Sequence, residues 1–145
     1  MNTEVPITAL SEDACWERLA TQRVGRIVTN VAGLLDIVPV NYVVDDRSIV
    51  FRTAEGTKLS SLVVNHEVLF EVDEYNDKSG WSVVIRGNAH RIQKLSEIER
   101  AEELPLKPMV ATVKMEFVRI MVASLTGRDF IFGEEPDRDA IHPGF

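Results

Sequence analysis

The chain has 145 residues, which is enough for one hydrophobic core and too few for two domains. Its hydrophobic fraction of 45% and its charged fraction of 27% are those of an ordinary globular protein. The net charge of −7 argues against binding of DNA or RNA, because nucleic-acid-binding surfaces are basic. A small phosphate-bearing ligand is compatible with this charge, since one or two local cations and backbone N–H groups can hold it.

The cysteine content and the first residues predict a cytoplasmic protein. Cys15 is the single cysteine, so no internal disulfide can form and a reducing compartment is expected. Residues Met1–Thr8 show no basic region followed by an apolar run, so no signal peptide is predicted. No apolar stretch is long enough to span a membrane, and no membrane partner is expected.

The N-terminal half predicts one helix followed by an antiparallel meander. Ser11–Gln22 begins with an N-cap serine, has acidic residues in its first turn and carries an apolar stripe, as a short amphipathic helix does. Three β-branched segments follow, with turns at residues 32–33 and 45–47 between them. These predicted strands are Arg26–Val31, Asp36–Val44 and Ser48–Thr53.

The C-terminal half predicts two further helices and three strands. One helix covers Thr57–Val64, and another begins at a capping box of Ser96 and Glu99 and is stopped by Pro105. The strands are Val68–Tyr75, Trp81–Ile92, which is expected to bend at Gly87, and Thr112–Val122.

Six strands with few, short helices predict a mainly β (α+β) fold. The expected architecture is a six-stranded antiparallel barrel with short flanking helices, because closure removes exposed strand edges. The domain is expected to occupy residues 1–132. Residues 133–145 form an acidic C-terminal tail, either loose or lying over a partner.

A phosphate site is suggested by the segment from Phe51 to Leu59, FRTAEGTKL. A strand ends here, a glycine allows a tight turn, and a helix opens with Thr57 and Lys58, so N–H groups, a hydroxyl and an ammonium converge. Arg52 and Thr53 can reach the same anion from the end of the strand. The alternative is that Thr57 only caps a helix and Lys58 is solvated, since the spacing does not match a Walker A loop.

Pro39 lies inside the second predicted strand and marks a sheet edge or an irregularity, because proline lacks the N–H that the ladder needs. A strand interrupted there offers backbone groups of Val40 and Asn41 to a ligand. An edge strand protected against aggregation explains the proline equally well.

Trp81 and Ser82 begin a predicted strand. The indole of Trp81 can pack on a flat ring or on a partner subunit, although such a tryptophan is more often part of the core or its rim. Ser82 can donate to or accept from the edge of a heterocycle.

Other chemistries are not supported. The three histidines are isolated and there is no second cysteine, so no metal site is predicted. Neither a G-x-S-x-G elbow nor a G-x-G-x-x-G loop is present, and Cys15 is expected to be a buried thiol on a helix stripe.

Taken in order, these segments resemble the pyridoxamine 5'-phosphate oxidase-like, FMN-binding split-barrel superfamily over roughly residues 10–128. The segments are VGRI from Val24, DIVPVNY from Asp36, FRTAEGTKL from Phe51, FEVD from Phe70 and GWSVVIRG from Gly80. The resemblance implies a split barrel and a homodimer with FMN in a cleft between the subunits.

The resemblance also assigns roles to individual residues. The backbone of Val40, Asn41 and Tyr42 would border the isoalloxazine. Trp81 and Ser82 would come from the other chain. The ribityl phosphate would be lined by Arg52, Thr53, Thr57 and Lys58.

One departure from the family bears on activity. Pyridoxamine 5'-phosphate oxidase itself carries an Arg-x-His pattern after its last strand, and residues Thr126–Phe130 lack it. Oxidation of pyridoxamine phosphate is therefore not expected.

Two classes of function follow from the resemblance. An FMN-dependent oxidoreductase of unknown substrate is favoured, with the flavin carrying the redox chemistry. The alternatives are a non-catalytic flavin-binding or sensing module, or a deazaflavin-dependent reductase, which the acidic net charge disfavours.

Overall fold

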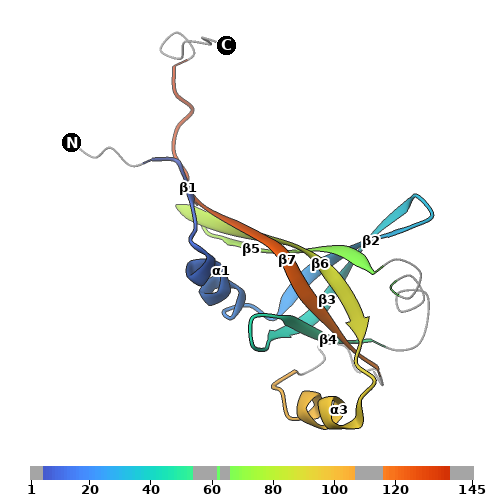
Figure 1. The fold of residues 1–145 in the computed structure, drawn as a ribbon. Helices are drawn as coiled ribbons and strands as arrows, with labels where there is room; N and C mark the ends of the chain where they lie inside the picture. The colour runs from blue at the N-terminus through green and yellow to red at the C-terminus, as the bar shows by residue number, and fades with distance from the viewer. Residues whose placement is uncertain (1–4, 54–61, 63–65, 107–115, 138–145) are drawn as a thin grey trace.

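The fold is a closed antiparallel barrel with one additional strand, seen in a computed structural model that describes residues 5–53, 62, 66–106 and 116–137 (Figure 1). Seven strands follow the order β1-β7-β4-β3-β2-β5-β6, and β6 also pairs with β7 and closes the ring. The mainly β, antiparallel barrel expected from the sequence is thus confirmed. The elements are β1 Ile7–Ala9, α1 Glu12–Leu19, β2 Val24–Val31, β3 Leu34–Val44, β4 Ile49–Thr53, β5 Glu67–Tyr75, β6 Ser79–Arg91, α3 Leu95–Glu102 and β7 Glu116–Ile131.

The two tight turns of the meander form where the sequence predicts them. Ala32 and Gly33 have φ of 52° and 84°, and Asp46 and Arg47 have φ of 49° and 55°. Positive φ at both central residues is the geometry of a two-residue turn that matches the twist of the flanking strands. These turns fix the registers of β2 with β3 and of β3 with β4.

The core fills the inside of the ring and is closed at one end by α1. Ile27, Phe70 and Ile85 are fully buried inside the barrel. At Gly25 a Cβ atom would lie 2.3 Å from the ring of Phe70, so only glycine fits there. Leu19 of α1 is also fully buried in this core.

The first helix begins after Ser11 as predicted, but it ends at Leu19 instead of Gln22. The Ser11 hydroxyl accepts from the N–H of Ala14, and Cys15 is buried. Burial raises the pKa of the Cys15 thiol. The helix Thr57–Val64 lies outside the described residues.

The prediction of a capping box at Ser96 was wrong. Lys94 occupies the N-cap position of α3 without a side-chain hydrogen bond, and Ser96 lies inside the first turn. The helix ends at Glu102, before Pro105, as expected. It covers a second, smaller cluster on the outside of the barrel, which includes Val50, Ile92, Ala101 and Phe117.

The last strand is longer than predicted. It runs to Ile131 instead of ending at Val122. The strand contains a β-bulge, because Val122 pairs with Gly87 and Ser124 pairs with Arg86, so Ala123 is an extra residue without a partner in the ladder. The irregularity falls at Gly87, where a bend was expected. The additional residues of β7 pair with β1, a strand that the sequence analysis did not predict.

Two further observations concern ligands and membranes. No group of three potential ligands for a metal ion occurs among the described residues. Within the same ranges, no helix is long and apolar enough to cross a membrane.

Candidate functional site

One group of the predicted flavin residues lies where β3 and β4 run side by side. Val40, Asn41 and Tyr42 are on β3, and Arg52 and Thr53 are at the end of β4. On its other side β4 pairs with β7, and Arg52 lies opposite Phe117 in this pairing. The guanidinium carbon of Arg52 lies 4.9 Å from the centroid of the Phe117 ring, a cation–π distance that fixes the side chain at this end of the strand. Thr57 and Lys58 lie outside the described residues.

The side chains of Val40 and Tyr42 point into the core. They are 5% and 4% exposed, and the Tyr42 hydroxyl donates to the carbonyl of Leu19 in α1. Burial raises the pKa of Tyr42, so its phenol stays protonated. Only the backbone of these residues is available to a ligand, which is the role that the resemblance implies.

The strand is not interrupted at Pro39, which corrects that part of the expectation. β3 continues through Pro39, which pairs with Arg26 of β2. On the other side, β4 pairs only with Tyr42–Val44, so residues 34–41 have no neighbouring strand there among the described residues. Pro39 has no N–H, and the N–H of Ile37 donates to the Asp36 carboxylate. At these two positions the edge therefore offers no N–H group to a further strand.

The second group lies at the far end of the barrel, around Trp81 and Ser82 of β6. A shallow pocket of about 280 Å³ opens there. Gly80 is close-packed, since a Cβ atom would lie 2.9 Å from the Tyr75 Cβ. The walls combine aromatic side chains with carboxylates: Glu71, Asp73, Glu74, Tyr75, Gly80, Trp81, Ser82, Phe130 and Phe132.

An ionisable pair borders this second pocket. One guanidinium nitrogen of Arg26 donates to Glu71 at 2.8 Å and to Asp73 at 3.1 Å. Burial and the adjacent Asp73 carboxylate raise the pKa of Glu71 to about 7, against the opposing effect of Arg26. The sequence reading did not single out this pair, although Glu and Asp two residues apart on a strand share a face.

Arg52 of the first group and Trp81 of the second group are far apart along β7. Arg52 is paired with Phe117 of β7, whereas Trp81 is paired with Asp129, twelve residues further along the same strand. Such a strand path is about 40 Å long. These two side chains therefore lie at different ends of β7.

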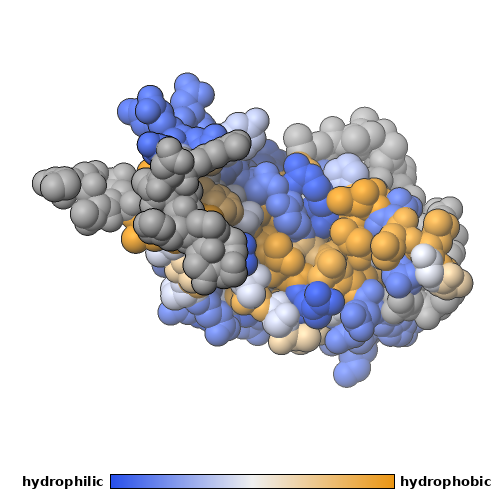
Figure 2. Space-filling view, turned by 90° about the horizontal axis from the view of Figure 1, so that it is seen from above, coloured by the Kyte–Doolittle hydropathy of each residue, from blue (hydrophilic) through white to orange (hydrophobic). Residues whose placement is uncertain are grey.

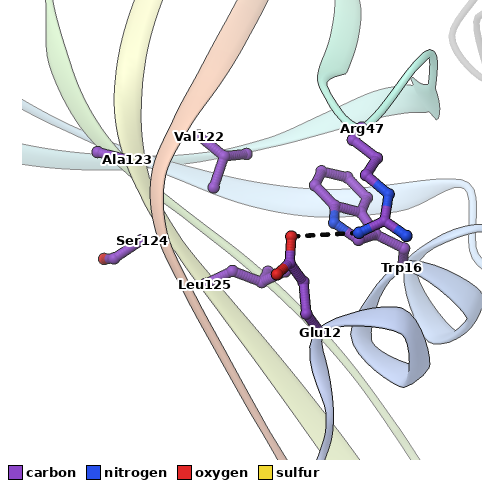
Figure 3. A pocket seen from close by; sticks show the side chains of 7 residues that line it. All are labelled: Glu12, Trp16, Arg47, Val122, Ala123, Ser124 and Leu125. Atoms are coloured by element: carbon purple, nitrogen blue, oxygen red, sulfur yellow. Dashed lines mark hydrogen bonds and ion pairs between the residues drawn. The ribbon is translucent and has the colours of Figure 1, made fainter.

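A separate pocket of about 310 Å³ lies beside α1, at the other end of β4 from Arg52 (Figure 3). It is lined by Glu12 and Trp16 of α1, by Arg47 of the β3–β4 turn, and by residues of the β7 bulge. Sequence reasoning gave no signal for it, because its walls come from three segments that only the fold brings together.

Comparison with known proteins agrees with this architecture. The family model described as pyridoxamine 5'-phosphate oxidase matches residues 11–129. An uncharacterized protein of Mycobacterium tuberculosis is 43% identical over 95 residues, which is 66% of this chain and 86% of that protein. A second uncharacterized protein of the same organism is 30% identical over 128 residues, covering 83% and 84% of the two chains.

Solved structures are also similar. A protein of Corynebacterium glutamicum superposes with a TM-score of 0.82 at 42% identity, covering 92% of this chain and 100% of that one. The FAD binding protein from Mycobacterium smegmatis gives a TM-score of 0.77 at 41% identity, with 86% and 99% covered. The chain therefore belongs to the pyridoxamine 5'-phosphate oxidase family, as the resemblance predicted.

Proposed function

We propose that this protein binds a flavin nucleotide, FMN, in a cleft shared by two copies of the chain. The observation that carries the proposal is the separation of Arg52 and Thr53 from Trp81 and Ser82, which pair with positions of β7 about twelve residues apart. A homodimer with two-fold symmetry brings the first group of one subunit to the second group of its partner, and does so twice.

The first group suits the phosphate and one edge of the flavin ring. Arg52 and Thr53 supply a cation and a hydroxyl at the end of β4, next to the segment that holds Thr57 and Lys58. Arg52 approaches from a fixed position over Phe117, which lowers the entropy lost when it binds an anion. Asn41, beside Arg52 at the end of the paired part of β3, presents backbone groups toward the same region.

The second group is suited to contact the exposed side of the flavin ring. Trp81 is half-buried against the core and offers an aromatic edge, and Ser82 offers a hydroxyl beside it. In the proposed dimer the Arg26–Glu71–Asp73 cluster comes close to the same cleft, because Asp73 is directly opposite Ser82 in the β5–β6 ladder.

Exposed hydrophobic side chains support the dimer. Figure 2 shows hydrophobic surface gathered over the middle of one face of a single chain. Leu34, Leu35 and Ile37 are 74%, 68% and 60% exposed, and Val84 is 38% exposed. Exposed apolar side chains of this kind favour an interface, and the occupant that we propose is a second copy of the chain.

We assign the protein to the flavin-dependent oxidoreductases, with the substrate unspecified. A bound flavin supplies the transfer of hydride or electrons. The Glu71 carboxyl, which Arg26 contacts at 2.8 Å and whose pKa burial and Asp73 raise to about 7, is the group that we propose to hold or release a proton there. Pyridoxamine phosphate is not proposed as the substrate. The single cysteine fits the reducing cytoplasm, where we place the protein.

FAD is the second candidate for the cofactor, because a protein that is 41% identical is named for FAD binding. The two nucleotides are distinguished by release from the purified protein and mass measurement. Retention of FMN at about one per chain supports the proposal. Retention of FAD alone would assign the larger nucleotide, and no flavin binding at tens of micromolar would overturn the proposal.

Subunit mixing tests the shared cleft directly. Arg52→Ala and Trp81→Ala are each expected to weaken FMN binding. When the two variants are unfolded together and refolded as a mixture, a mixed dimer has one cleft with both substitutions and one with neither. About a quarter of all clefts should then regain the original affinity. Absence of any such recovery, although mixed dimers form, would place both residues in the same subunit's site and refute the shared cleft.

A further inference from the structure

The outer face of the barrel carries a charged cluster on β2 and β5. Burial alternates along both strands, with Ile27 and Phe70 inside the barrel, so Arg26 and Glu71 face outward. These two residues lie opposite each other in the β2–β5 ladder. One guanidinium nitrogen of Arg26 donates to Glu71 at 2.8 Å and to Asp73, the next outward residue of β5, at 3.1 Å.

Apolar side chains surround this cluster on the same face. Across the sheet, Arg26 lies opposite Pro39 of β3, and Glu71 lies opposite Val84 of β6. A charged centre within an apolar face fits a partner that covers the face and also offers the opposite charges. The exposed apolar residues of this outer face are Val24, Leu35, Ile37, Pro39 and Val84.

The cluster is complementary to its own copy. When two such faces pack with two-fold symmetry, an axis parallel to the strands, between β2 and β5, lays β2 of each chain over β5 of its partner. This places Arg26 over Glu71 of the partner subunit, and it does so twice. Both bonds within the chain use the same nitrogen of Arg26, and its other terminal nitrogen makes no hydrogen bond to the described residues, so it can donate to the partner.

The same two-fold axis joins the two groups of the proposed flavin site. Two residues along the strands from the Arg26–Glu71 pair, Asn41 of β3 lies opposite Val24, and Ser82 of β6 lies opposite Asp73. β3 and β6 are equally far from the axis, since each is next to one strand of the central pair β2 and β5. An axis placed by the charges therefore also lays Asn41 of one chain over Ser82 of the partner subunit.

We propose that two copies of the chain pack through the outer faces of β2, β3, β5 and β6, with Arg26 of each chain donating to the Glu71 carboxylate of the partner subunit. This interface rests on the dimer of the proposed function and specifies which face forms it. Burial and the Asp73 carboxylate raise the pKa of Glu71 to about 7, so a proton taken up by Glu71 can offset the excess of carboxylates over guanidinium groups in the cluster.

Charge reversal in two separate chains tests the pairing. Arg26→Glu places a carboxylate over Glu71 of the partner subunit, and Glu71→Lys places an ammonium over Arg26 of the partner subunit. Each variant alone should therefore dimerise about tenfold more weakly or worse. A mixture of the two variants should form mixed dimers with about the original affinity, because opposite charges face each other across the interface while like charges remain within each chain. Sedimentation equilibrium and native mass spectrometry at pH 8, where Glu71 is mostly ionised, measure both.

Two further variants complete the test. Arg47→Glu is the matched control, since Arg47 is ion-paired and exposed to a similar extent but lies in the β3–β4 turn, away from this face. It should leave dimerisation unchanged. Arg26→Gln introduces no like charge and serves if a reversed variant does not fold, which circular dichroism detects. It should weaken the dimer about three- to tenfold.

Two results would overturn this interface. One is weakening of both folded variants without recovery in the mixture, since the charges would then act only within each chain. The other is unchanged dimerisation of Arg26→Glu or Arg26→Gln. Neither result affects the proposed flavin cleft if the unmodified protein is a dimer that binds FMN. A monomer that binds FMN would instead refute the shared cleft itself.

Discussion

Replacement of Asp45 by asparagine is expected to destabilise the barrel more than any nearby surface change. The carboxylate lies at the β3–β4 turn and its side chain is 9% exposed. Arg100 of α3 donates to one oxygen at 2.9 Å and Arg119 of β7 donates to the other at 3.0 Å. One carboxylate thus ties α3 to the barrel wall through two charge-assisted hydrogen bonds.

The expected loss is about 2–3 kcal/mol at pH 7, because a hydrogen bond to a charged group contributes about 1.5–3 kcal/mol and Arg100 is largely solvated. For a domain of this length that corresponds to a fall in Tm of about 5–10 °C. Burial alone would raise the pKa of Asp45, but the hydrogen bonds from Arg100 and Arg119 outweigh it and hold the pKa below its ordinary value. The stabilisation is therefore present above the unfolded pKa of about 3.9 and is lost as the pH falls through the lower folded value.

Urea unfolding at pH 7 and thermal unfolding between pH 3 and pH 7 measure both effects. Asp46→Asn is the matched control, since the adjacent residue has a positive φ that asparagine tolerates and is exposed. Asp46→Asn should change the free energy of unfolding by no more than about 0.5 kcal/mol. Equal stability of the two variants at pH 7, or a difference that persists unchanged at pH 3, would refute the role of Asp45.

Three further outcomes are expected. Lys58→Ala should weaken FMN binding about ten- to a hundredfold and leave riboflavin binding unchanged, because riboflavin lacks the phosphate; equal small effects on both ligands in fluorescence titrations would remove Lys58 from the site. The Glu71 carboxyl should titrate near pH 7 by carbon NMR, and Asp73→Asn should lower its pKa, so the contribution of Glu71 to stability is present at low pH and fades as the pH rises through 7. A Glu71 pKa near 4.3 in the unmodified protein would contradict this. Gly87→Ala should cost about 2–3 kcal/mol, since the added Cβ would lie 2.3 Å from the Met121 carbonyl oxygen; an unchanged urea midpoint would show that the bulge relaxes.

Helices and strands could be predicted where the spacing of apolar residues and the turn residues indicate the same element. The six ring strands could be predicted from their β-branched segments, and the first three of these are separated by short turns such as Ala32–Gly33. Helix α1 was found because Ser11 caps an amphipathic run. The three-residue β1 was missed because it has too few residues to show a period, and it pairs with a segment more than 100 residues away.

The candidate flavin residues could also be singled out from the chain, as Arg52, Thr53, Trp81 and Ser82 stand in motifs with a recognisable order. Their separation along β7, and with it the argument for a shared cleft, depends on the pairing of β4 and β6 with one long strand. That strand continues past Val122 through a bulge opposite Gly87, which accommodates one extra residue. Gly87 predicts a bend in β6, but the register shift itself depends on the pairing of β6 with β7.

The positions of charged residues could be predicted from the sequence, but their pKa values depend on the tertiary structure. Sequence spacing alone places Glu71 and Asp73 on one face of a strand, but the raised pKa of Glu71 needs the burial and the Arg26 contact that the β2–β5 pairing creates. The pocket at Trp16 exists because β1 and β4 pair with one edge of β7 and leave a gap. Side-chain period and turn type are set by neighbours in the chain, whereas strand pairing and burial are set by contacts between distant segments, and these only the folded barrel decides.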